Sequence, residues 1–387
     1  MRVIKSHDRK FFERVRSSMP FYWTSLFITF LLVSTGLYSI ATHAQVQKDE
    51  QVEFSRCWAF TEPDVRFSAI AADEKTVFAS APGAKMVAVA VATGAKLWAT
   101  ELGGEIVSNL LIVEAGLFVV TDSVPTGTAK KGLSTLRLLS SDTGITIKTV
   151  PLIPAESFTI GFDNGSVIIV SNSGDLYAFD SSASVLKWNS KTIGRVNGKT
   201  FIAQGSIVAG TPEGQVVRLG SQTGEISRTL KATTVPTTAM YTAAGQLVYG
   251  DVRGNVTAVD AHWRFRTGGQ ISGVYEIGNG YIVTSFDNFI YLLSKNTGSV
   301  VWKKRMAGRI ADISFNSAVT ALVFTSGAET AVLIELKKGK TLGQIALSEP
   351  TESVDLPDKS GKRLVFALNG SIFVFSSERC ETENGTR

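Results

Sequence analysis

The sequence predicts an all-β fold, an eight-bladed β-propeller of four-stranded antiparallel blades. Three observations support this prediction. Short β-branched runs recur eight times between Thr76 and Phe375. The repeat period is close to about forty residues. The runs are separated by tight polar or glycine turns, a combination that is typical of propeller blades.

The first run of each repeat can be aligned along the chain, and only two steps depart clearly from the period. The aligned starts are Thr76, Leu117, Val167, Ser206, Gln246, Tyr281, Ala321 and Arg363. The longest step contains a polar insertion, Ser123 to Gly132, where other repeats have a tight turn. The shortest step follows a repeat that lacks part of its outer turn, so that Trp263 closely follows Asp260. Because both changes fall in turns, the strands of each repeat remain intact.

Each repeat carries two turn signals, and several repeats add a tryptophan. The turn pairs are Ser173-Gly174, Glu213-Gly214, Arg253-Gly254 and Asn369-Gly370, then Thr93-Gly94, Thr143-Gly144, Thr223-Gly224 and Thr297-Gly298. Their glycines tolerate the positive φ of a tight turn. Trp98, Trp188 and Trp302 follow the second turn at a constant offset, while Lys148 and Arg228 occupy this slot in weaker repeats. We interpret the tryptophans as structural residues that dock adjacent blades.

The same residues resemble a known repeat family. Leu-Tyr-Ala-Phe-Asp at 176 to 180, and Thr297-Gly298 followed by Trp302, resemble the pyrroloquinoline-quinone-like (PQQ-like) repeat. The resemblance covers nearly everything after residue 53, and it is specific for architecture rather than for activity. It implies one of two kinds of protein. The family includes quinoprotein dehydrogenases and non-catalytic propellers such as the lipoprotein of the outer-membrane β-barrel assembly machine.

Both ends of the chain are expected to close the ring. The last repeat ends at residues 371–375 without an outer strand, and residues 56–60, which include Trp58, read like residues 96–100. The N-terminal segment should therefore complete the last blade. This arrangement places Cys57 and Cys380 on opposite sides of one turn, at a separation that a disulfide can span. The sequence thus predicts a disulfide, which requires an oxidising compartment, with two unrelated thiols as the alternative.

The N-terminus predicts export. Residues 1–19 form a basic cytoplasmic tail that contains Arg2, Lys5, Arg9, Lys10, Arg14 and Arg16. Residues 20–44 form a transmembrane anchor or a cleavable signal segment, and both readings place the propeller on the periplasmic side of the cell envelope. The remaining segments are a linker at 45–53, the propeller at 54–380 and a flexible tail at 381–387. No cysteine closely follows the apolar stretch, so the lipid attachment site implied by the resemblance is missing.

Composition excludes several classes of function. Outside the basic tail, acidic and basic residues nearly balance, which gives no electrostatic case for nucleic acid. His262 is the only histidine in the propeller, so neither a zinc site nor a Ser-His-Asp triad is expected. Asp163, Asp251 and Asp287 could bind Ca²⁺, but carboxylates at these places are more typical of β-turns. We therefore predict no catalytic, cofactor-binding or metal-binding residues, no cofactor and no enzyme activity.

The sequence favours a non-catalytic scaffold that binds other envelope proteins, in outer-membrane protein assembly, as a monomeric propeller. Candidate contacts are Lys130 and Lys131 in the long loop and exposed aromatic residues such as Phe286 and Phe289. Two alternatives stay open: a small PQQ-dependent quinoprotein oxidoreductase, and an extracytoplasmic carbohydrate-binding or sensor propeller.

Overall fold

The computed structural model describes residues 53–63, 65–123, 132–192, 194–278, 280–316, 320–325, 330–347, 353–355, 363–368 and 370–380. The chain divides into two compact units, Met1–Glu50 and Gln51–Arg387, and every described residue belongs to the second. The expected membrane or signal segment, the tail at 381–387, and Lys130 and Lys131 lie outside the described residues. No helix in the described ranges is long and apolar enough to cross a membrane.

The described part of the chain consists of β-strands arranged in consecutive antiparallel sheets. The sheets near the N-terminus contain β2 (Ala69–Ala72), β3 (Thr76–Ala81), β4 (Lys85–Ala90) and β5 (Lys96–Glu101); β6 (Glu105–Ile106), β7 (Leu111–Val113), β8 (Gly116–Asp122), β9 (Ser134–Leu139) and β10 (Thr146–Leu152); and β11 (Phe158–Asp163), β12 (Ser166–Ser171), β13 (Asp175–Asp180) and β14 (Leu186–Lys191).

The central sheets contain β15 (Asn197–Ala203), β16 (Ser206–Gly210), β17 (Gln215–Gly220) and β18 (Ile226–Lys231); then β19 (Pro236–Tyr241), β20 (Leu247–Asp251), β21 (Asn255–Ala258) and β22 (Trp263–Arg266). The later sheets contain β23 (Ile271–Ile277), β24 (Gly280–Ser285), β25 (Phe289–Ser294) and β26 (Val300–Arg305); then β27 (Ile310–Asn316), β28 (Thr320–Thr325), β29 (Thr330–Glu335) and β30 (Thr341–Ala346). The final sheet contains β31 (Ser353–Asp355), β32 (Arg363–Leu368), β33 (Ser371–Ser376) and β1 (Ser55–Thr61).

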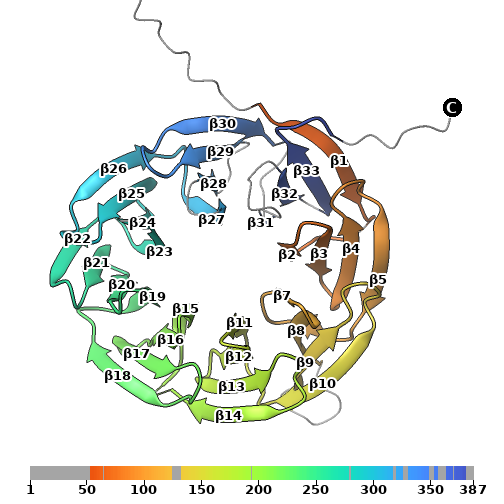
Figure 1. Cartoon of the computed structure of the whole chain (residues 1–387), viewed down its shortest axis with the longest axis horizontal. Coiled ribbons are helices and arrows are strands. Elements are labelled where there is room, and N and C mark those ends of the chain that lie inside the picture. The colour runs from red at the N-terminus through yellow and green to blue at the C-terminus, as the bar shows by residue number, and fades with distance from the viewer. Residues whose placement is uncertain are drawn as a thin grey trace, which may run out of the picture. The chain divides into compact units, whose positions relative to one another are not determined.

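The sheets follow one another around a ring, which confirms a β-propeller built from four-stranded antiparallel blades (Figure 1). In each blade the first strand lies innermost and the last lies on the outer wall. Two blades, β15–β18 and β19–β22, are joined into one eight-stranded sheet by a single parallel pairing of Lys199 with Thr238. In another blade, β6 and β7 share the inner position, and the Asn109 side chain between them hydrogen-bonds the backbone of Ile160 in the next blade.

The N-terminal strand completes the last blade, as the sequence predicted. β1 pairs antiparallel with β33, from Ser55 opposite Ser376 to Thr61 opposite Ser371, and the two strands run side by side in the ring (Figure 1). An outer strand and its neighbour therefore come from opposite ends of the sequence. This closure leaves no gap between the β31–β33 blade and the β2–β5 blade.

The hydrophobic core lies between blades rather than within one layer. In β12, Val167 and Ile169 pack toward the β8–β9 side, whereas Ile168 and Val170 pack toward β16 and β17. Successive residues of a strand point to opposite faces, and both faces of this strand are covered. The middle strands consequently carry apolar residues on both faces, which explains why several of them read as nearly continuous hydrophobic runs in the sequence.

Candidate functional site

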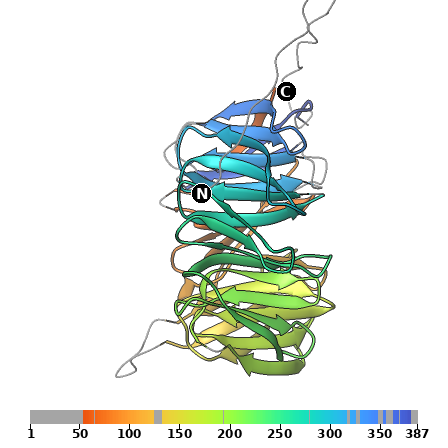
Figure 2. The same cartoon turned by 90° about the vertical axis from the view of Figure 1, so that its left-hand side faces the viewer.

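Turns and connections gather on two opposite faces of the ring (Figure 2). Because neighbouring strands are antiparallel, the turn between the second and third strands of a blade lies at the same end as the connection to the next blade. We call this end the connection face. It contains the turn between β24 and β25, which carries Phe286.

A small aromatic and cationic patch occupies part of the connection face. It consists of the exposed pair Phe286 and Arg309 together with Val252 and Arg253, which are exposed in the corresponding turn of the preceding blade, and we call these residues the Phe286 patch. Phe286 is 37% exposed, and the Arg309 guanidinium carbon lies 5.0 Å from the centroid of its ring. Exposed aromatic and arginine side chains on a rigid surface are typical of protein interfaces.

The two turns of the Phe286 patch are held by the connection between them. The Thr267 amide donates to the Gly254 carbonyl at 2.8 Å, and the Phe286 amide donates to the Gln270 carbonyl at 2.8 Å. The Gly268 amide donates to the Asp287 carboxylate at 2.8 Å. The patch is therefore supported by backbone hydrogen bonds and needs little ordering when a partner binds.

Each of the three acidic residues considered as Ca²⁺ ligands is engaged by a turn or by a neighbouring side chain. Asp163 accepts from the Gly205 amide at 2.9 Å and from the Ser221 hydroxyl. Asp251 accepts from the Arg253 and Asn255 amides, each at 2.9 Å. These bonds support the interpretation of the carboxylates as turn residues. Within the described ranges, no cluster of three or more histidine, cysteine, aspartate or glutamate side chains could hold a metal ion.

Asp287 additionally binds a buried phenol. The Tyr291 hydroxyl donates to the Asp287 carboxylate at 2.6 Å, and burial together with this carboxylate raises the pKa of Tyr291. Phe289, which we expected to be exposed, is instead half-buried because its ring packs 5.9 Å from the Tyr291 ring. His262 lies exposed in the short turn between β21 and β22 and adopts a left-handed backbone with a φ of 55°.

Tryptophans on the outer strands join consecutive blades. Each indole nitrogen donates to a turn carbonyl of the next blade: Trp58 to Val91 at 2.9 Å, Trp98 to Ser141 at 2.8 Å, Trp188 to Ser221 at 3.1 Å, Trp263 to Lys295 at 2.7 Å and Trp302 to Leu336 at 2.9 Å. A turn glycine lies beneath each ring, namely Gly94, Gly144, Gly224, Gly298 and Gly339. Trp263 follows the shortened turn recognised in the sequence, but it was not included among the predicted docking tryptophans because it lacks their usual offset.

In some blades another residue occupies the tryptophan position of the outer strand. Arg228 occupies it in β18, and its guanidinium forms an ion pair at 2.7 Å with Asp260 in the next blade. At the matching left-handed turn position, the β11–β14 and β19–β22 blades carry Ala183 and His262 instead of glycine. Glycine is therefore found at those turns whose left-handed residue lies beneath an indole ring.

The buried side chain of Tyr281 is expected to make the stability of the protein fall at alkaline pH. Burial, reinforced by the nearby Glu276 carboxylate, raises the pKa of Tyr281 to about 12. Because the folded protein holds this proton more tightly than the unfolded chain, the associated stability is complete below pH ~10 and is lost as the pH rises toward ~12. We expect Tyr281→Phe to lose less stability than wild type between these pH values, measured by urea unfolding. An identical pH dependence of the two proteins would contradict this assignment.

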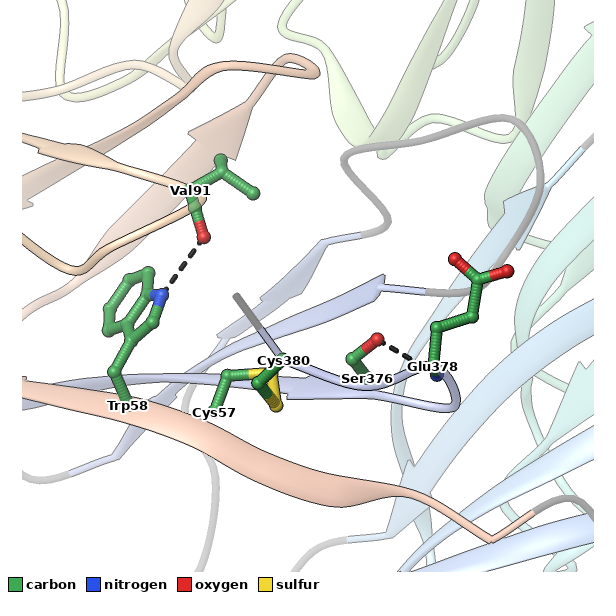
Figure 3. The surroundings of a disulfide bond; sticks show 6 residues. All are labelled: Cys57, Trp58, Val91, Ser376, Glu378 and Cys380. Atoms are coloured by element: carbon green, nitrogen blue, oxygen red, sulfur yellow. Dashed lines mark hydrogen bonds between the residues drawn. A yellow bond between two sulfur atoms is a disulfide. The ribbon is translucent and has the colours of Figure 1, made fainter. Parts of the chain in front are cut away.

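A disulfide joins the two ends of the propeller at the closing seam. Cys57 and Cys380 form the bond with their α-carbons 5.3 Å apart and 323 residues apart in sequence. The adjacent Trp58 reaches across to Val91, while the Glu378 amide donates to the Ser376 hydroxyl (Figure 3). The described structure contains no free cysteine. The bond and the β1–β33 pairing therefore secure the same blade.

Comparisons with known proteins agree with this architecture. A protein-family model described as outer membrane protein assembly factor BamB matches residues 55–147, 132–262 and 229–381. The chain is similar to the crystal structure of BamB from Moraxella catarrhalis, with a TM-score of 0.60, 14% identity, and coverage of 87% of this chain and 99% of that chain. It is also similar to the crystal structure of the computationally designed Ika8 protein, with a TM-score of 0.68, 15% identity, and coverage of 83% and 99%. No curated protein matches the chain.

Proposed function

Since the chain belongs to the family described as outer membrane protein assembly factor BamB, we propose that it is a non-catalytic scaffold that binds protein partners in the cell envelope. Its process would be outer-membrane protein assembly. The observation that carries this proposal is the family match across the whole ring, residues 55–381. We also propose a ring of eight blades, in which the β15–β22 sheet counts as two.

The proposed location is the extracytoplasmic side of the membrane, with the propeller at residues 54–380. The Cys57–Cys380 disulfide supports this location, because such bonds persist in oxidising compartments such as the periplasm. The basic tail at 1–19 and the apolar stretch at 20–44 support export, with the segment acting as an anchor or as a signal.

The Phe286 patch is the proposed partner surface. It combines an aromatic ring with two arginines on turns that are already ordered, and arginine and aromatic residues often dominate binding energy at interfaces. A rigid ring can present such a patch without a conformational change. The geometry therefore fits recognition of a folded protein better than turnover of a small substrate.

Site-specific cross-linking in cells tests this surface. We expect the photoreactive amino acid p-benzoylphenylalanine in place of Phe286 to cross-link to a component of the outer-membrane assembly machinery. The matched control is the same amino acid in place of Val301, which lies in β26 of the same blade and is 58% exposed on the outer wall. Equal yields from both positions would contradict the surface assignment.

A second measurement addresses catalysis directly. We expect the purified propeller to neither bind pyrroloquinoline quinone with Ca²⁺ in equilibrium dialysis nor reduce a dye with alcohols or sugars. The engagement of Asp163, Asp251 and Asp287 in local hydrogen bonds supports this expectation. Stoichiometric quinone binding together with turnover would overturn the scaffold function.

A further inference from the structure

One seam of the outer wall has a hollow at the place where the following seam holds a pair of aromatic rings. Between β18 and the β20–β22 strands lies a cavity of about 640 Å³ that opens on the outer wall, and we call it the wall notch. The residues that matter for its chemistry are Leu230, Lys231, Tyr249, Thr257, His262 and Arg264. The wall notch is separate from the Phe286 patch, which lies on turns of the connection face.

The notch exists because an aromatic pair has been replaced. Thr257 pairs with Tyr249 and with Arg264 across three strands. One blade further on, Tyr291 holds the matching place between Val283 and Lys303. The Tyr291 ring packs edge-on, 5.4 Å from Phe265 of the preceding blade. At the notch, Thr257 stands in place of that tyrosine.

The second partner of the pair is also smaller at the notch. Leu230 of β18 holds the place that Phe265 has in β22. Thr257 and Leu230 are therefore smaller than their counterparts in the next seam, although Tyr249 stands where the next blade has Val283. The space left is large enough for an aromatic side chain and its flanking residues.

Two ties between the blades keep the notch open at fixed width. At one end is the Arg228–Asp260 ion pair at 2.7 Å, and at the other Arg264 donates to the Thr233 hydroxyl at 3.2 Å. Thr257 lines the notch between them. Its hydroxyl oxygen is buried and has no hydrogen-bond partner within the described structure, so it is not accessible to a ligand in the notch.

The rim of the notch carries two basic side chains. Lys231 and Arg264 are exposed along it, and no aspartate or glutamate belongs to the lining. Such a rim attracts acidic groups and disfavours basic ones. The notch therefore combines an aromatic-sized space with two exposed basic side chains on its border.

We propose that the wall notch binds a short extended segment of a partner protein that presents a tyrosine between acidic residues. The tyrosine ring takes the space that corresponds to Tyr291 in the next blade, and the carboxylates of the segment pair with Lys231 and Arg264 on the rim. The proposal depends on the proposed scaffold function only because it takes the ligand to be a segment of a protein. Failure of the notch would leave cross-linking at Phe286 unaffected, so the two proposals fail independently.

Binding of a labelled peptide to the whole exported propeller tests the proposal. The probe is fluorescein-labelled Glu-Asp-Tyr-Asp-Glu, measured by fluorescence polarisation. We expect saturable binding that weakens as salt is raised, since exposed charges are screened. We expect Thr257→Tyr, which fills the space with the protein's own ring, to weaken binding at least ~10-fold, as loss of a central aromatic anchor does. Arg264→Ser should also weaken binding, whereas Lys303→Ser at the matching place on the next blade should not.

Changes in the peptide provide a test that does not depend on folding of the variants. Replacing its tyrosine with alanine, or its carboxylates with amides, should each abolish saturable binding to the wild-type propeller. Absence of binding by the acidic peptide, equal binding of the amide peptide, or unchanged binding to a folded Thr257→Tyr protein would each overturn the proposal. Benzoate competing as well as the peptide would assign the notch to a small aromatic anion instead.

Discussion

Replacing Cys57 with serine is expected to lower the free energy of unfolding by about 4–5 kcal/mol, the largest effect of any single change considered. The bond spans 323 residues, and a cross-link over so long a stretch removes much conformational entropy from the unfolded chain. Urea unfolding of the variant and the wild type, followed by tryptophan fluorescence, measures this difference.

Reduction provides the matched comparison for the disulfide. Wild-type protein in a reducing agent should unfold at the same urea concentration as Cys57→Ser, and Cys380→Ser should behave in the same way. The double variant should be no less stable than either single one, because each removes the same bond. A variant as stable as the oxidised wild type would show that the β1–β33 pairing alone secures the seam.

Truncation of a seam tryptophan should have the next largest effect. Trp98→Ala is expected to destabilise the protein by about 3–5 kcal/mol, because removing a buried aromatic ring leaves a cavity that the structure refills only in part. The ring is 8% exposed, lies 5.8 Å from Phe78, and donates a hydrogen bond to Ser141 in the next blade. The free energy of unfolding in urea measures the loss.

Two controls distinguish docking from general sensitivity of this strand. Leu97, the neighbour of Trp98, is 50% exposed, so Leu97→Ala should change stability by less than ~0.5 kcal/mol. Gly144→Ala should be destabilising even though it adds only one methyl group, since a β-carbon there would lie 2.5 Å from the Trp98 ring. A tolerated alanine at Gly144 would contradict the described contact between turn and indole.

The second and third strands of each blade could be predicted because they are buried on both faces. The expected starts at Thr76, Ser206 and Arg363 coincide with the first residues of β3, β16 and β32. Burial on both faces favours apolar residues at successive positions, and glycine turns mark where such runs end. Strands could be predicted wherever an apolar run ends at a glycine turn.

The innermost strands were not identified from the sequence, for an equally physical reason. They are short or mixed in character, as in β2 with four residues and β15 with the sequence Asn-Gly-Lys-Thr-Phe-Ile-Ala. The inner edge of a blade borders the centre of the ring, so less of each strand is packed and fewer apolar residues are needed (Figure 1). Hydrophobic patterning is therefore weakest there.

Some of the surface residues could likewise be predicted from the sequence, whereas others could not. Phe286 was found because an aromatic residue in a turn is unusual, but Val252 and Arg309 gave no signal, since their proximity to that turn depends on contacts between blades. The wall notch was also invisible, because Thr257 is an ordinary strand residue until it is compared with Tyr291 at the matching place. Sites made between repeats require the ring to be assembled first.

The pairing of β1 with β33 constrains when the molecule can finish folding. During synthesis from the N-terminus, β1 is made before the other strands, but its partner β33 is made after all of them. Intermediate blades can form as they emerge, since each is a local hairpin array. Until β33 is made, β1 has an unpaired edge. We expect aggregation of the nascent protein, and its need for protection by other proteins, to be greatest in this interval.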